Sequence, residues 1–261
     1  MKRLAVAVLL FLFLLSSAVP LTLAAPEVSS TEATMEYNPG LAMNDAVFDL
    51  FTQTVTLRAN PIKHAVADLN NDSRNDLAVI YQGSKVLDIF FSGPSYNFTA
   101  TPSMNVTFLH QPTGLATGDM DNDGEVDIVV SLDYDGENNI AICYQKNSFS
   151  SSEPSAKYFD ASLRQKEVLL HDLNEDGYLD VVALHSMDDP MYEAGFSVYR
   201  STGPNTYSLT LKSLPVDTYS PDRMTMGDFS GEGRQDLVIS DPIAKKVIGY
   251  RNDAVTGATW T

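Results

Sequence analysis

The fold is decided by one short stretch, Asp119-Met120-Asp121-Asn122-Asp123-Gly124-Glu125-Val126-Asp127, which runs directly into Ile128-Val129-Val130. Carboxylates at loop positions 1, 3, 5 and 9 can surround a hard cation with oxygen atoms. Gly124 at position 6 permits a sharp turn, and Glu125 at position 7 can offer its backbone carbonyl. The stretch therefore predicts a calcium-binding loop.

The residues after the loop separate it from the helical EF-hand. An EF-hand carries a bidentate Glu at position 12 and continues as a helix. Position 12 is Val130 here, and it lies in a β-branched run that is typical of a buried strand. We therefore expect the loop to join two strands.

The same loop pattern occurs four times along the chain. The loops start at Asp68, Asp119, Asp172 and Asp228, which are 51, 53 and 56 residues apart. This nearly constant spacing indicates a repeated structural unit. The candidate metal ligands are Asp68, Asn70, Asp72, Arg74 and Asp76 in the first loop; Asp119, Asp121, Asp123, Glu125 and Asp127 in the second; Asp172, Asn174, Asp176, Tyr178 and Asp180 in the third; and Asp228, Ser230, Glu232 and Asp236 in the fourth.

Two of the loops depart from the pattern. Ser73 replaces glycine in the first loop, so a residue with a side chain must adopt the turn conformation. In the fourth loop, Ser230 offers a shorter hydroxyl and Glu232 a longer carboxylate. The alternative for any of these loops is an Asp/Asn-rich turn that caps its own backbone without metal. If metal is bound, Ca2+ is expected rather than Mg2+, because a flexible carboxylate-rich loop suits a large cation.

Each repeat also has the same order of predicted strands. A segment of small or apolar residues leads into the loop, at residues 62–67, 113–118, 167–171 and 223–227. A β-branched strand leaves it, at 77–80, 128–130, 181–184 and 237–239. A third strand follows at 86–91, 140–144, 196–199 and 247–250, and weaker fourth segments occur at 104–109 and 207–214. Four strands per unit with turns between them predict propeller blades.

With these loops and strands, the chain from about Ala46 onward resembles the FG-GAP/VCBS repeat family. The resemblance implies an all-β fold, a β-propeller of four-stranded antiparallel blades with calcium in its loops. Propellers of this family usually close with seven blades, whereas four loops are visible here. We therefore expect an incomplete propeller, a fragment of a larger ring, in preference to a small ring.

The N-terminus has the order of segments found in a secretory signal peptide. Lys2 and Arg3 precede an apolar run, and small residues follow at Ala24 and Ala25. The apolar run is short for a membrane span, which favours a signal peptide. An uncleaved anchor is the alternative, because residues 20–23 could prolong the apolar run. The expected organisation is a signal peptide at 1–25, a linker at 26–45 and the repeats at 46–261, secreted or at the cell surface.

The charge of the chain argues against nucleic-acid and membrane partners, and its cysteine content argues against a catalytic thiol. The formal net charge is −17, with 34 acidic against 17 basic residues, and such a surface repels nucleic acid and anionic lipid. We therefore expect no nucleic-acid partner, and no membrane insertion once the signal peptide is removed. Cys143 is the single cysteine, and its apolar neighbours predict a buried structural thiol.

The sequence carries no recognisable catalytic motif, so no catalytic residue and no enzyme activity are predicted. The first hypothesis is a secreted calcium-binding propeller that acts in adhesion or binds an extracellular protein or glycan. The alternative is the non-catalytic propeller portion of a larger secreted polysaccharide-active enzyme, and a structural role in a cell envelope is a third possibility. Ligand contact is expected at the turns opposite the loops, at residues 81–85, 133–139, 186–195 and 241–246, with Tyr192 as a candidate.

Overall fold

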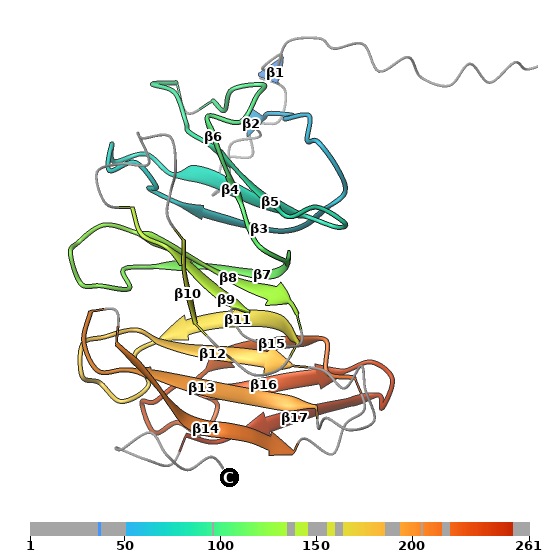
Figure 1. Ribbon diagram of the computed structural model, residues 1–261, viewed down its shortest axis with the longest axis vertical. Helices are drawn as coiled ribbons and strands as arrows, with labels where there is room; N and C mark the ends of the chain where they lie inside the picture. The colour runs from blue at the N-terminus through green and yellow to red at the C-terminus, as the bar shows by residue number, and fades with distance from the viewer. Residues whose placement is uncertain are drawn as a thin grey trace, which may run out of the picture. The chain divides into compact units, whose positions relative to one another are not determined.

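The computed structural model describes residues 36–37, 51–95, 97–134, 139–145, 156–159, 164–185, 194–204, 206–215 and 220–252. Met1–Thr34 forms one unit and Met35–Thr261 a second, and all described residues belong to the second. The expected signal peptide and almost all of the expected linker lie outside the described residues. The described part consists of strands and turns and contains no helix (Figure 1).

Four antiparallel sheets follow one another along the chain and form the blades. Their strands are β3 (Pro61–Ala67), β4 (Asp76–Tyr81), β5 (Val86–Phe90) and β6 (Met104–Thr107); β7 (Gln111–Gly118), β8 (Asp127–Asp133), β9 (Ile140–Cys143) and β10 (Ala156–Phe159); β11 (Gln165–His171), β12 (Asp180–His185), β13 (Gly195–Ser201) and β14 (Tyr207–Pro215); and β15 (Arg223–Gly227), β16 (Asp236–Asp241) and β17 (Lys246–Tyr250). Within each blade the strands pair in chain order. A separate two-stranded pair, β1 (Glu36–Tyr37) and β2 (Phe51–Thr52), precedes them.

The expected all-β fold of antiparallel blades is confirmed, and the predicted strand ranges agree with the observed ones. Strand β10, which completes the second blade, was not identified from the sequence. It pairs with β9 through Ala156 opposite Cys143 and Phe159 opposite Ile140. Within the described ranges, three of the blades have four strands and the fourth blade has three.

Each blade contributes alternate residues to the cores on its two faces, which explains the continuous apolar runs of the second strands. In β8, Ile128 and Val130 pack in the core shared with the first blade, whereas Val129 packs in the core shared with the third. A third core joins the blades of β12 and β16, with Val182 and Ile239 among its members. Burial on both faces requires apolar residues at consecutive positions. The second strands therefore lack the alternation of apolar and polar residues that marks a strand buried on one face.

The outer face of the first blade is covered by the segment that precedes it. Val55 and Leu57 pack against Val79, Tyr81 and Phe90 on that face. Covering this face removes apolar surface that the stacking of blades would otherwise leave exposed.

Polar contacts between the first strands of the blades add to the apolar cores. Glu167 in β11 pairs with Lys63 of β3 and also accepts the backbone N–H of Met224 in β15 at 2.7 Å. Gly114 in β7 lies so close to β11 that an added Cβ would be 2.8 Å from the Cα of Glu167. The first strands therefore approach one another closely, and one carboxylate connects three blades.

Candidate metal centres

Each predicted loop connects the first strand of its blade to the second. The loops run from β3 to β4, from β7 to β8, from β11 to β12 and from β15 to β16. All four therefore emerge at the same end of their blades. This arrangement follows from the sequence order of small segment, loop and β-branched strand.

The position-9 aspartates are the most buried acids of the loops. Asp76, Asp127, Asp180 and Asp236 are each at most 1% exposed. In each, one carboxylate oxygen accepts the backbone N–H of loop position 2, and the other accepts a backbone N–H at the end of the third strand. For Asp127 these donors are Met120 at 2.8 Å and Gln145 at 2.9 Å. Position 9 thus fixes the loop to its blade, a role that the sequence reasoning did not foresee.

The position-1 aspartates shape the turn itself. The two oxygens of Asp119 accept the backbone N–H groups of Asp123 at 3.1 Å and Gly124 at 2.9 Å. Asp68, Asp172 and Asp228 make the same pair of contacts in their own loops. These bonds turn the loop backbone around the carboxylates, and they would form in a metal-free turn as well.

Two positions in each loop adopt the left-handed backbone conformation. At position 6, Gly124, Gly177 and Gly233 have φ between 86° and 89°, and Ser73 has φ of 66°. The expectation that Ser73 takes the glycine conformation is therefore confirmed. Position 4 behaves in the same way, with positive φ at Asn71, Asn122, Glu175 and Gly231. Asn and Gly tolerate this conformation best, so their presence at position 4 was a signal available in the sequence.

The second loop brings its carboxylates closest together. Oxygen atoms of Asp119, Asp121 and Asp127 lie within 4.8 Å of one another. Burial, together with the nearby charges of Asp121 and Asp123, raises the pKa of Asp127 to about 7, against the opposing effect of two backbone N–H donors. Hard oxygen donors that converge within this distance and repel one another fit a divalent cation such as calcium.

The third loop also fits a cation, with an amide in place of one carboxylate. The side-chain oxygen of Asn174 is buried and has no hydrogen-bond partner, while its NH2 group donates to Asp176 at 2.7 Å. Burial raises the pKa of Asp180 to about 6. A buried amide oxygen without a partner is costly, and a bound cation would satisfy it.

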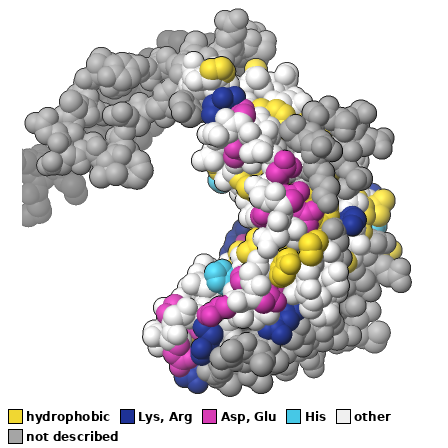
Figure 2. All heavy atoms as spheres, turned by 90° about the vertical axis from the view of Figure 1, so that its left-hand side faces the viewer, with side chains coloured by type: hydrophobic (Ala, Val, Ile, Leu, Met, Phe, Trp, Pro, Cys, Tyr) yellow, Lys and Arg dark blue, Asp and Glu magenta, His cyan; other side chains and the backbone are white. Residues whose placement is uncertain are grey.

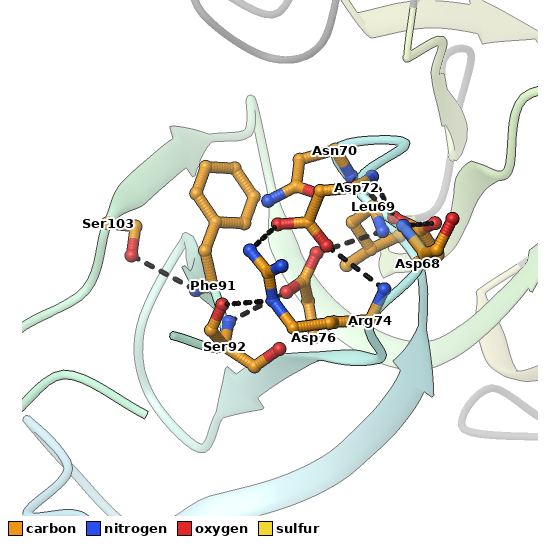
Figure 3. A network of polar contacts seen from close by, with 10 residues as sticks. Asp68, Leu69, Asn70, Asp72, Arg74, Asp76, Phe91, Ser92 and Ser103 are labelled. Carbon is orange, nitrogen blue, oxygen red and sulfur yellow. Dashed lines mark hydrogen bonds and ion pairs between the residues drawn. The ribbon is translucent and has the colours of Figure 1, made fainter. Parts of the chain in front are cut away.

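The first and fourth loops contain an arginine within the site. Figure 3 shows Arg74, at position 7, with its guanidinium between Asp72 and the backbone carbonyl of Ser92. Arg234 occupies position 7 of the fourth loop, beside Glu232. Arg74 was among the predicted metal ligands and Arg234 was not, although the basic residue at position 7 was visible in both loops.

Acidic and basic side chains are interspersed on the face seen in Figure 2.

At the end of the blades opposite the loops, His110 stacks on Tyr134 with ring centroids 3.7 Å apart and planes 3° from parallel. Tyr134 is 40% exposed, the neighbouring Leu109 is 52% exposed, and Arg164 lies 3.7 Å from Asp133. The candidate Tyr192 lies outside the described residues.

The expected structural role of Cys143 is confirmed. Its side chain is fully buried in the core between the first and second blades. Burial raises the pKa of its thiol to about 12, so the reactive thiolate is suppressed.

The fold and the loops define an all-β repeat protein of the propeller type, with oxygen-rich loops between the first and second strands of its blades. A family profile described as FG-GAP-like repeat matches residues 45–130 and 172–239. The chain therefore belongs to the FG-GAP-like repeat family. Such repeats are typically non-catalytic and ligand-binding or adhesive, and they are typical of extracellular or surface proteins.

Comparison with curated proteins gave no match. Among solved structures, the crystal structure of BBS1N in complex with ARL6DN, soaked with mercury, is similar at 10% sequence identity with a TM-score of 0.38. The match covers 72% of this chain and 63% of that one, so this chain spans less than two thirds of the length of the BBS1N chain.

Within the described ranges, no helix is long and apolar enough to cross a membrane.

Proposed function

We propose that this chain is a secreted or cell-surface β-propeller module that binds calcium in its loops and an extracellular protein or glycan at the opposite end of its blades. The observation that carries the proposal is the convergence of Asp119, Asp121 and Asp127 in the second loop. Membership of the FG-GAP-like repeat family supports the same function.

Calcium would act on stability and loop geometry. In the second loop it would be held by Asp119, Asp121, Asp123 and Asp127 with the carbonyl of Glu125, and in the third by the corresponding residues from Asp172 to Asp180. When bound, the ion supplies positive charge to carboxylates that are otherwise buried beside one another. The loop backbone, already shaped by the position-1 aspartates, keeps the oxygens in place.

The stacked pair His110 and Tyr134 supports ligand binding at the other end of the blades. Exposed aromatic rings offer a flat apolar surface at low conformational cost and are enriched where proteins bind partners. Asp133 and Arg164 lie nearby with hydrogen-bonding groups. A flat apolar surface with polar groups beside it matches the faces and hydroxyl groups of a sugar ring, so this surface favours a glycan ligand.

The test is binding of the purified protein, in calcium, to an array of glycans and to intact cells. We expect Tyr134→Ala and His110→Ala to weaken binding by about tenfold or more. Val66→Ala removes a side chain that is 55% exposed at the loop end of the first blade and serves as the control. Absence of binding to both glycans and cells, or binding that these aromatic substitutions leave unchanged, would contradict the proposal.

A further inference from the structure

The first loop contains its own cation. The guanidinium of Arg74 pairs with the carboxylate of Asp72 and donates through Nε to the carbonyl of Ser92 at 3.1 Å. Ser92 is also the residue whose backbone N–H is bound by Asp76 at 2.8 Å. Arg74 therefore links position 5 of the loop to the strand end that position 9 holds (Figure 3).

The fourth loop repeats this arrangement with different residues. Arg234 donates through Nη2 to Glu232 at 2.6 Å and through Nε to the carbonyl of Asn252 at 2.9 Å. The backbone N–H of Asn252 is bound by Asp236 at 2.9 Å. A second guanidinium, that of Arg251, lies 3.6 Å from the other carboxylate oxygen of Glu232. In both loops the guanidinium binds the position-5 carboxylate and the backbone carbonyl at the end of the third strand. Because the position-5 acid differs between the two loops, this arrangement depends on the arginine at position 7.

The two central loops have no basic residue at this position. Glu125 occupies position 7 of the second loop and Tyr178 that of the third. In the second loop carboxylates converge around Asp121, and in the third the amide oxygen of Asn174 has no hydrogen-bond partner. The hydroxyl of Ser230 in the fourth loop is also buried without a partner, so the arginine at position 7 is what separates the two pairs of loops. The chain thus contains two classes of loop, which differ in whether a cation is built into the sequence.

We infer that Arg74 and Arg234 serve as resident cations of the first and fourth loops, and that only the second and third loops bind calcium tightly. The inference rests on the proposed calcium function and assigns it to particular loops. A fixed guanidinium uses carboxylate lone pairs that calcium would need, and it repels a divalent ion nearby. The first and fourth loops should therefore bind calcium about tenfold or more weakly than the central pair.

The test is a count of bound ions by native mass spectrometry of the purified protein at a calcium concentration that just saturates its tight sites. We expect two ions. Truncation at position 3 of each loop then assigns them: Asp121→Ala and Asn174→Ala should each remove one ion, whereas Asn70→Ala and Ser230→Ala should remove none. These matched truncations do not depend on the behaviour of any arginine variant.

Removing the resident cation gives the converse result. Arg74→Gln should add a third ion, while Arg164→Gln, which removes an arginine outside the loops, should leave the count at two. Four ions in the unmodified protein, or loss of an ion in Asn70→Ala or Ser230→Ala, would overturn the inference and leave the calcium function standing. No bound ion in the unmodified protein would overturn both.

Discussion

The carboxylate of Asp127 accepts the backbone N–H of Met120, seven residues earlier, at 2.8 Å and so closes the second loop from inside. Its other oxygen accepts the N–H of Gln145 at the end of the third strand. The same pair of bonds recurs at position 9 of every loop, including that of Asp180 with Leu173 and Ser201. The acid that the sequence pattern assigns to a metal is therefore also a structural link within its blade.

Truncation of this acid should destabilise the protein even without metal. In Asp127→Ala, two buried N–H groups lose their acceptor, at a cost of about 2 to 4 kcal/mol in the free energy of unfolding. Urea unfolding in chelator measures this cost. Asp133→Ala, at a half-exposed carboxylate in the same blade, is the control and should change stability by less than about 0.5 kcal/mol. Equal effects of the two substitutions would contradict the structural role of Asp127.

Ser73 offers a stabilising substitution. Its φ of 66° is a conformation that costs a residue with a Cβ about 1 kcal/mol and glycine almost nothing. Ser73→Gly should therefore raise the free energy of unfolding by about 0.5 to 1 kcal/mol. Thermal unfolding measures this gain. Ser73→Ala removes the hydroxyl and keeps the Cβ, so it should not raise the stability and serves as the control. A loss of stability in Ser73→Gly would be the contrary result.

Glu167 and Lys63 form a pair in which the carboxylate is the more buried partner. Lys63→Met leaves this carboxylate without its counter-ion, and we expect a cost of about 3 kcal/mol in the free energy of unfolding. Glu167→Gln keeps an acceptor for the N–H of Met224 and should cost about 1 to 2 kcal/mol. Denaturant unfolding of both single variants and the double variant separates the shared contribution. A larger cost for Glu167→Gln than for Lys63→Met would contradict this account.

The effect of calcium should depend on pH, because the ion competes with protons. Burial raises the pKa of Asp127 from 3.8 to about 7 and that of Asp180 to about 6. The folded apo protein therefore holds these protons more tightly than the unfolded chain, and its stability in chelator should fall as pH rises from about 4 to 7. Calcium requires the ionised carboxylates, so it should bind best at the upper end of this range.

Thermal unfolding in calcium and in chelator at about pH 5 and pH 8 measures this linkage. The calcium-induced rise in the unfolding midpoint should be clearly smaller at the lower pH. The variant Asp133→Ala should show the same dependence as the unmodified protein. A calcium effect of equal size at both pH values would show that the buried aspartates are not the groups that bind the ion.

The fold could be predicted from the sequence because its signals are local and repeated. Four loops at steady spacing, each followed by a β-branched strand, fix the order of strands within every blade. The two-sided burial of Val129 and its neighbours Ile128 and Val130 was visible as a continuous apolar run. Strand β10 carries no such run, because it has four residues, of which Lys157 is exposed and the others are only partly buried.

The chemistry of the loops was only partly predictable. The spacing identifies the oxygen donors but does not show that Asp127 is held by two backbone N–H groups, since one donor comes from a different strand. The same limit applies to Arg74, whose side chain reaches Ser92, 18 residues away. Glu167 and Lys63 are separated by 104 residues, and no local pattern indicates such a contact.

Calcium bound in the loops should stabilise the fold as a whole. The measurement that tests this is the unfolding midpoint of the purified protein in millimolar calcium, in equal magnesium and in excess chelator. Ligand bound only by the folded state raises the midpoint by mass action, so we predict a clear rise in calcium, a much smaller one in magnesium, and the lowest midpoint in chelator. A cooperative transition at the same temperature in all three solutions would contradict the calcium assignment.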